Sequence, residues 1–371
     1  TALDWYDAPD PRPDYYRNLP SYFYMENTDY NRQNFAKYAW AKEAWESDSP
    51  STTHLNWDRL YAVNSLNATD AGNRSKYVIE ERRVDQNDLN FALNGKWNPV
   101  KFLTINGGLS YKWNRTEYYK VLDDLLGGDY YVNIDQFAER DFAAYPTMIQ
   151  NDLDYFIKNG AAQTLKEGDK YGYDYYAHVR RAEAWASGRF TFGGLEATVA
   201  GRLGYSKFWR EGLLRKGLFP GLDENGNPFT YNGNVITKYD QIDGKPITSK
   251  GESDKKDFLT GSGKLNLSYF IRGGHRIYAD AAYITEAPTF NQAFISPRTR
   301  NTIMPDLKTI KTLTADINYA YRNSGYDFRV TGFYTSIKDQ TDVMSFYDDS
   351  QNSFTNFAMS GIDERHIGVE L

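Results

Sequence analysis

A hairpin pattern repeats along this chain: two segments that alternate apolar and polar residues meet at a short turn, and a long polar segment then leads to the next pair. Between residues 103 and 113, for example, Leu103 and Ile105 fall on one face, whereas Thr104 and Asn106 fall on the other. Side chains alternate between two faces in a β-strand, so a period of two residues indicates strands rather than helices. The pattern predicts long antiparallel strands, each with one apolar and one polar face.

The turns give the strand count. Four pairs of alternating segments meet at short stretches that contain glycine, asparagine or proline, and a last segment ends at Leu371, so we expect nine strands. Each strand is expected to run for roughly twenty residues, and Pro99 should end the first ladder because a proline has no N–H to donate. The expected turns are 98–100, 193–194, 272–274 and 323–325, and the expected connections at the other end are 121–171, 216–253, 287–307 and 341–357.

Composition decides what kind of sheet these strands make. The mean hydropathy is -0.70, and the sequence has no run of eighteen apolar residues. A membrane-spanning helix needs such a run, so helical membrane spans are excluded. A membrane barrel escapes this test because only alternate residues meet lipid. Aromatic residues make up 16% of the chain and include 31 tyrosines, and such rings collect where a barrel wall crosses the lipid headgroups. Short turns at one end and long loops at the other are typical of outer-membrane barrels. We therefore predict an all-β fold: a transmembrane antiparallel β-barrel.

The segment 1–74 is expected to be mostly an extracellular loop, and 75–371 to hold the hairpins and their loops. A helix carrying Phe35, Tyr38 and Trp45 is predicted, with Thr28 or Asp29 as its cap, because these residues recur at helical spacing. Another short helix is expected at about 148–158. Loops of this length with internal structure are usually functional.

Charge and cysteine content exclude several functions. The net charge is -6 and no basic stripe with interleaved aromatic residues is present, which argues against a nucleic-acid partner. The absence of cysteine excludes disulfides, thiolate metal sites and cysteine catalysis.

No motif for covalent chemistry is found, so we expect neither an enzyme nor a cofactor. His54, His178, His275 and His366 lie in separate elements without metal-ligand spacing. One loop begins like a calcium site, but it lacks the distal bidentate glutamate, so a hairpin turn is favoured and calcium is left as an alternative. Its oxygen side chains belong to Asp223, Asn225 and Asn227.

Two groups of side chains are the candidates for function. Charged residues on the polar strand faces would line the lumen, where cross-strand pairing is the favoured explanation and contact with a plug the alternative. These are Lys112, Arg181, Glu183, Arg189, Glu196, Arg202 and Arg276. Aromatic and arginine side chains near the outer mouth would anchor a ligand or pack the loops. These are Trp40, Trp45, Tyr130, Tyr131, Trp209, Arg298 and Arg300.

Short motifs add a family resemblance. Residues 8–22 (APDPRPDYYRNLPSY), 286–290 (EAPTF) with 296–301 (SPRTRN), and 333–339 (FYTSIKD) resemble parts of TonB-dependent outer-membrane receptors of Bacteroidetes, in the subgroup that carries a carboxypeptidase-regulatory-like domain. The resemblance implies a barrel of about 22 strands, an amino-terminal plug, and TonB-coupled nutrient uptake across the bacterial outer membrane. It implies as partners TonB, outer-membrane lipid and a small-molecule, glycan or peptide substrate, and leaves open a surface lipoprotein lid.

With nine expected strands, the chain would be a barrel fragment, and the signal peptide, plug and carboxy-terminal strands are expected to lie outside it. Two alternatives remain open. One is a passive porin or a barrel that anchors an adhesin. The other is a soluble all-β glycan-binding protein, in which the apolar strand faces would meet a second sheet and tyrosines would stack on sugars.

Overall fold

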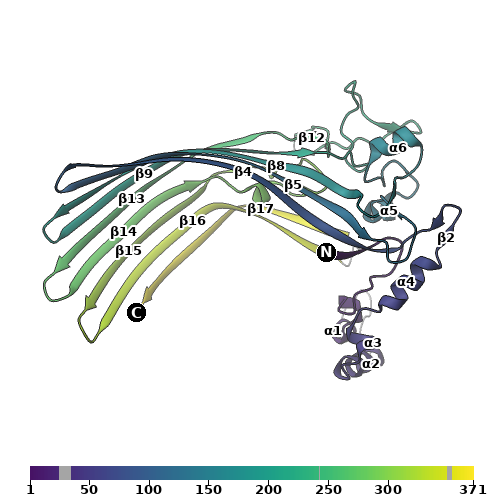
Figure 1. The fold of residues 1–371 in the computed structure, drawn as a ribbon, viewed down its shortest axis with the longest axis horizontal. Helices are drawn as coiled ribbons and strands as arrows, with labels where there is room; N and C mark the ends of the chain where they lie inside the picture. The colour runs from purple at the N-terminus through teal and green to yellow at the C-terminus, as the bar shows by residue number, and fades with distance from the viewer. Residues whose placement is uncertain (25–34, 242, 349–352) are drawn as a thin grey trace. The chain divides into compact units, whose positions relative to one another are not determined.

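The computed structural model describes residues 1–24, 35–241, 243–348 and 353–371. An 11-stranded antiparallel sheet dominates it, in the order β1-β4-β5-β8-β9-β13-β14-β15-β16-β17, with β12 beside β9 (Figure 1). Its strands are β1 (Ala2–Trp5), β4 (Tyr77–Val100), β5 (Leu103–Asp124), β8 (Lys170–Phe192), β9 (Leu195–Gly212), β12 (Gly251–Glu252), β13 (Lys256–Ile271), β14 (His275–Glu286), β15 (Ile310–Arg322), β16 (Asp327–Asp348) and β17 (Ser353–Glu370).

The nine predicted strands are confirmed as β4, β5, β8, β9 and β13 to β17, and the short strands β1 and β12 were not predicted. The turns at 193–194, 272–274 and 323–325 are confirmed. The turn predicted at 98–100 is wrong, because β4 continues to Val100 and the chain turns at residues 101 and 102. Pro99 is tolerated there because its missing N–H falls at the end of the ladder.

The long connections follow β5, β9 and β14, as predicted. The loop predicted at 341–357 is wrong. β16 and β17 stay paired from Thr341 opposite Ser360 as far as Asp348 opposite Ser353. Polar residues in this stretch suggested a loop, but facing pairs such as Met344 and Phe357 stabilise a ladder, and a single sequence does not show which residues will face each other.

The chain divides into two compact units, which are described separately. Unit 1 comprises residues 1–83 and 119–172, and unit 2 comprises residues 84–118 and 173–371. Among the described residues, no helix is both long enough and apolar enough to cross a bilayer.

Unit 1 holds the loops around short helices and hairpins. Its elements besides the sheet are η1 (Tyr16–Asn18), α1 (Pro20–Tyr24), α2 (Phe35–Glu46), α3 (Pro50–Thr53), α4 (Trp57–Ser65), α5 (Gln136–Phe142), α6 (Leu153–Asn159), and the pairs β2 (Ala68–Thr69) with β3 (Gly72–Asn73) and β6 (Tyr131–Val132) with β7 (Thr164–Leu165). The predicted helix through Phe35 is α2, whereas its proposed caps Thr28 and Asp29 lie outside the described residues. The helix predicted at 148–158 starts later, at Leu153, because the Asp152 carboxylate caps it by accepting from the Tyr155 N–H.

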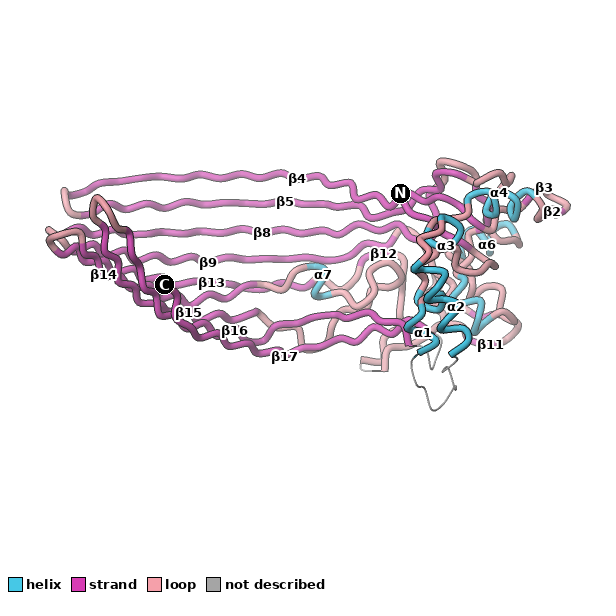
Figure 2. Tube along the Cα trace, turned by 90° about the horizontal axis from the view of Figure 1, so that it is seen from below, coloured by secondary structure: helices cyan, strands magenta, loops and turns pink. Residues whose placement is uncertain are grey.

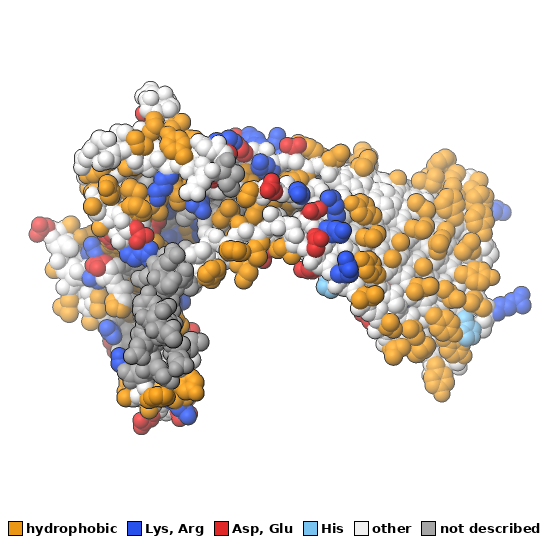
Figure 3. All heavy atoms as spheres, turned by 180° about the vertical axis from the view of Figure 1, so that it is seen from behind, with side chains coloured by type: hydrophobic (Ala, Val, Ile, Leu, Met, Phe, Trp, Pro, Cys, Tyr) orange, Lys and Arg blue, Asp and Glu red, His pale blue; other side chains and the backbone are white. Residues whose placement is uncertain are grey.

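In unit 2, apolar and polar side chains alternate between the two sides of the long strands. Leu265 of β13 lies opposite Val199 of β9 and Ala281 of β14, and Leu265 and Val199 are 42% and 51% exposed. The next residue, Asn266, lies opposite Asp280 on the other side of the sheet. We call the side of Leu265 the apolar face and the side of Asn266 the polar face. Figure 3 shows apolar side chains covering the sheet near the tight turns, with charged side chains farther along the strands.

The polar face of unit 2 gains its own apolar cluster toward the long loops. There α7 (Phe290–Ala293), on the connection between β14 and β15, packs Phe290 and Phe294 against Tyr175 and Phe208 of β8 and β9. Figure 2 shows α7 beside the long strands. A capping box, in which Thr289 and Gln292 each bond the other's backbone N–H, fixes where this helix begins. Loop residues therefore cover the polar face at this end of the strands.

Ala186 and Ser187 of β8 test which face meets lipid, because they are neighbours on opposite faces. Ala186→Lys should make folding into lipid vesicles less favourable by about 2–4 kcal/mol, since a lysine in the bilayer midplane is costly, whereas Ser187→Lys should change the folding free energy little. The measurement is denaturant-dependent folding of the full-length protein into vesicles. Equal losses for both variants would contradict the assignment of the faces.

Candidate functional site

All the charged residues predicted to line the lumen lie on the polar face of unit 2, and most have partners there. Arg189 and Glu196 form an ion pair of 2.6 Å across the β8–β9 hairpin. Arg202 lies 3.5 Å from Glu183 and 3.7 Å from Glu286. Neighbouring strands therefore hold these charges together, as the pairing interpretation expects.

The remaining members of this group are held differently. Lys112 of β5 lies 3.5 Å from Asp88 of β4. Arg276 donates to Ser268 at 2.7 Å and lies over the Phe270 ring. Arg181 takes part in no ion pair within the described part of the chain. Whether any of these residues touches a plug stays a prediction.

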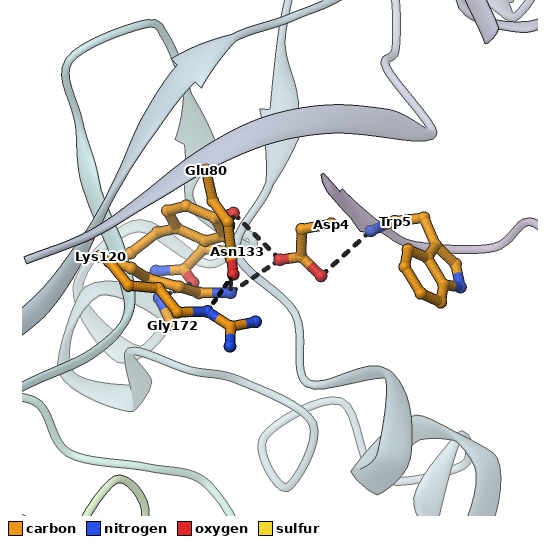
Figure 4. A network of polar contacts seen from close by, with 8 residues as sticks. Asp4, Trp5, Glu80, Lys120, Asn133 and Gly172 are labelled. Carbon is orange, nitrogen blue, oxygen red and sulfur yellow. Dashed lines mark hydrogen bonds and ion pairs between the residues drawn. The ribbon is translucent and has the colours of Figure 1, made fainter. Parts of the chain in front are cut away.

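A buried polar network in unit 1 joins four strands, and the sequence did not predict it (Figure 4). Lys120 of β5 donates to Asp4 of β1 and to Glu80 of β4, both at 2.7 Å. The Tyr171 hydroxyl of β8 donates to the same two carboxylates at 3.0 and 3.1 Å. Arg82 donates to the second oxygen of Glu80 at 2.6 Å, and the Glu80 side chain is 0% exposed. Two carboxylates and two cations thus neutralise each other around the fully buried Glu80, while Arg82 reaches it from the solvent side with 53% of its side chain exposed.

The network sets the protonation of its members. Burial raises the pKa of Asp4, but the ion pair and hydrogen bond from Lys120 outweigh this, so that pKa lies below its usual value. Burial, followed by the charges of Asp4 and Glu80, raises the pKa of the Tyr171 hydroxyl far above its usual value, so it stays a donor. The backbone leaves room for this arrangement: Gly172 has a φ of +70°, and a side chain there would collide with the Lys120 stem.

Arg210 organises the loops of unit 2. Its side chain is among the fully buried ones and lies 4.9 Å from the Tyr175 ring centroid. The guanidinium donates to the Pro297 carbonyl at 2.6 Å, to the Ser249 carbonyl at 2.8 Å and to the Asn301 side chain. Burial lowers the pKa of Arg210 to about 10, so it stays charged at neutral pH. One arginine of β9 therefore fastens two separate loop segments to the polar face.

The tryptophans predicted as ligand anchors, Trp40 and Trp45 of α2, line one pocket of about 620 Å³ in unit 1. Trp40 is 69% exposed, and the Trp45 indole N–H donates to the Asn18 carbonyl at 3.4 Å. Arginines share the walls, among them Arg12 and Arg59. The pocket therefore combines exposed aromatic surface with positive charge.

The other ligand candidates are placed apart from this pocket. Tyr130 and Tyr131 of unit 1 are 9% and 4% exposed; the first bonds the Thr69 hydroxyl and the second lies in the core. Their side chains offer a ligand almost no surface. In unit 2, Arg298 lies over the Tyr173 ring, and Arg300 lies over the Phe219 ring and lines a groove of about 750 Å³.

Trp209 lies on the apolar-face side of β9, beyond the lipid-facing rows. It stacks on His178 with a centroid distance of 4.6 Å and an interplanar angle of 6°, and Arg180 and Lys255 lie over its ring. This side is opposite to the one on which α7 and the predicted lumen charges lie. Whether Trp209 contacts a ligand near the outer mouth stays a prediction.

The calcium-like loop has the geometry of a turn. The Asp223 carboxylate accepts from the N–H groups of Asn225 and Asn227 at 2.9 and 2.7 Å. Within the described ranges, no group of three or more histidine, aspartate or glutamate side chains is arranged to hold a metal ion.

The family model described as "TonB dependent receptor-like, beta-barrel" matches residues 2–371. The chain belongs to the TonB-dependent receptor family. No curated protein matches it. Similar solved structures are a copper transporter, OprC (11% identity, TM-score 0.48, covering 78% of this chain and 36% of that one), and the closed form of the ferric-catecholate import receptor Fiu of E. coli K12 (11% identity, TM-score 0.40, covering 78% and 35%). The chain thus spans about a third of the length of these structures.

The family is one of outer-membrane barrels, which agrees with the predicted fold class. Residues that sequence reasoning missed in this receptor barrel are Asp4, Glu80, Lys120 and Arg210. The one available signal was the alternation of side chains along β9. Arg210 lies an even number of residues from Arg202, so both point to the polar face. Nothing in the sequence indicated that Asp4, 116 residues before Lys120, would pair with it.

Lys120→Met should release β1 from β4, because it leaves the largely buried Asp4 without a cation and Glu80 with Arg82 alone. Breaking such a pair costs about 3–5 kcal/mol. The measurement is hydrogen exchange of the β1 amides in the full-length protein. A variant that combines Lys120→Met with Asp4→Asn and Glu80→Gln removes the three buried charges and leaves only the half-exposed Arg82, so it should recover part of the protection. If Lys120→Met exchanges like the wild type, the network does not hold β1.

The same network predicts a pH dependence. The pKa of Asp4 is lower in the folded protein than the ordinary aspartate value of 3.8, so its contribution to stability is present above pH 3.8 and is lost as the pH falls through the folded value. We expect β1 protection to fall below pH 3.8 in the wild type. An Asp4→Asn variant should lack this step. A step of the same size in that variant would assign it to another group.

Proposed function

We propose that this chain is part of an energy-coupled transporter of the bacterial outer membrane, in which the long loops capture a ligand and the lumen passes it to the periplasm. The observation that carries the proposal is the family match along residues 2–371. The polar face, with its paired charges, suits a lumen that holds a plug by ion pairs that can be rearranged. TonB would act through a region outside this chain.

We further propose that the parent protein is of the Bacteroidetes type, on the resemblance of residues 8–22, 286–301 and 333–339 to that subgroup. The ligand would be a small molecule, glycan or peptide, and a surface lipoprotein would be a natural partner of the loops. We assign ligand capture to the unit 1 pocket that Trp40 and Trp45 line, because these side chains present aromatic surface beside arginines. The reaction is transport and involves no covalent chemistry.

The two alternatives differ from this proposal in what they require. A soluble glycan-binding protein would cover its apolar strand faces with a second sheet, yet Leu259 and Ile317 of unit 2 are 75% and 62% exposed. A passive porin or adhesin anchor keeps the barrel but needs no energy. Energy coupling is therefore the property to test.

A deletion strain of the source bacterium should grow poorly on one limiting nutrient among peptides, glycans, siderophore-bound iron and cobalamin, and the full-length gene should restore growth. Uptake of that nutrient should stop when a protonophore removes the inner-membrane gradient, because transport by this family depends on TonB. The measurement is uptake of the labelled nutrient with and without protonophore. Uptake that continues unchanged would favour the passive porin.

Trp40→Ala and Trp45→Ala should each weaken binding of the nutrient so identified by about 2 kcal/mol, which is about thirtyfold in Kd, since buried tryptophan contacts dominate binding surfaces. Trp97→Ala is the matched control, because Trp97 lies beside the tight turn that ends β4. The measurement is equilibrium binding to the purified full-length protein. Unchanged binding in both pocket variants would move the capture site elsewhere.

A further inference from the structure

On the apolar face of unit 2, the register of β14 to β17 places residues in rows that cross the strands. Facing residues of an antiparallel pair lie on the same side of the sheet, so each row shares one environment. Toward the long loops the rows change from apolar to cationic within two steps. They are Ala281, Ala315, Tyr334 and Ile367, then Tyr283, Leu313, Ser336 and Arg365, then Thr285, Lys311 and Lys338.

A groove of about 410 Å³ lies where this change occurs. Tyr283, Leu313 and Tyr334 form its apolar part, and Lys311, Lys338 and Arg365 supply positive charge. The groove therefore continues the lipid-facing surface on one side and is cationic on the other.

A β-bulge brings an extra side chain to this groove. The register between β16 and β17 shifts between Ile337 and Gln340, and Asp339 has a φ of +59°. In a regular strand Lys338 and Asp339 would point to opposite faces, but here both line the groove. Asp339 accepts from Lys311 at 2.8 Å. Lys338 and Arg365 form no ion pair with any residue that the structure describes, so the groove keeps a net positive charge.

The same sequence of environments recurs on β8 and β9. Ala182 faces Tyr205, the next outward pair is Arg180 with Lys207, and the one after it is His178 with Trp209. The Arg180 guanidinium lies 4.7 Å from the Trp113 ring centroid. Aromatic and basic side chains at the end of an apolar surface are what a membrane–water boundary attracts. The cations of the groove thus lie at headgroup level.

We propose that the groove of Lys311, Lys338 and Arg365 binds the phosphate of an anionic lipid headgroup in the leaflet on the long-loop side. Lys338 and Arg365 would donate charge-assisted hydrogen bonds to the phosphate oxygens, and the tyrosines and Leu313 would contact the start of the acyl chains. The inference rests on the membrane location that accompanies the proposed function. It does not depend on the transported ligand or on energy coupling.

The test uses the full-length protein in neutral detergent and two lipid probes, the phosphorylated glycolipid lipid A and phosphatidylcholine, with binding read by native mass spectrometry. The wild type should prefer lipid A. The double variant Lys338→Gln with Arg365→Gln should bind it about 25-fold more weakly, at about fivefold for each cation near an anionic surface. Arg272→Gln with Arg322→Gln removes the same charge at the tight turns and should bind as the wild type does.

A charge-preserving variant, Lys338→Arg with Arg365→Lys, should keep the preference, and heat-dependent gel migration reports folding of every variant. Unchanged binding in the double glutamine variant overturns the proposal. Displacement of lipid A by millimolar inorganic phosphate also overturns it, because the groove would then be a site for free phosphate. Loss of energy-coupled uptake with lipid preference intact would count against the proposed function alone, and the reverse result against this inference alone.

Discussion

Pairing of backbone N–H and C=O groups between neighbouring antiparallel strands is the constraint on which the rest of this structure depends. A bilayer supplies no water to an unpaired peptide group. A chain that crosses it as strands must therefore hydrogen-bond each strand to its neighbours along its length. The ladder between β9 and β13 runs without a break from Phe208 opposite Lys256 to Leu195 opposite Tyr269. A slip of β13 by one residue against β9 would turn Leu265 into the lumen and Asn266 toward lipid, while Val199 of β9 kept its place. Register therefore fixes the two faces, and the faces fix where every functional side chain lies.

Most of the fold could be predicted from the period of the strands and the residue types in the turns. Nine strands and the turns at 193–194, 272–274 and 323–325 were predictable because alternation and glycine are local signals. The errors lie where tertiary pairing decides the outcome. β1 has four residues, too few to show a period, and the β16–β17 ladder depends on partners such as Met344 and Phe357 that only the fold brings together. The same division applies to the site: the polar-face charges follow parity and were predictable, whereas Asp4, Glu80 and Arg210 depend on contacts distant in sequence.

The length of the strands explains a reversal of surface chemistry along them. A membrane strand needs about 9–11 residues, whereas β4 has 24 and β8 has 23. In the part of unit 2 near the tight turns, the outward face is apolar and the other face is polar. Beyond Tyr205 the outward face carries Lys207 and the opposite face carries Phe208 under α7. Once a strand leaves the bilayer, water meets its outward side and loops cover its inward side. The outward side chains there are polar and the inward ones apolar, which reverses the pattern within the bilayer. In the proposed membrane location, the boundary falls at the point of reversal.

Capture by loops requires that the loops hold their shape, and hydrophobic burial alone does not specify one arrangement of long polar segments. Arg210 holds Pro297, Ser249 and Asn301 through directional donors, and Lys120 holds Asp4 and Glu80 in the same way. A guanidinium or ammonium out of water is stable only when those acceptors are in place, so a shifted loop leaves a buried charge unsatisfied. Exposed residues such as Trp40 take no part in either group of bonds. Ligand preference can therefore change through such residues while the buried bonds keep the loops in position, which is why the sequence specifies the barrel more clearly than its cargo.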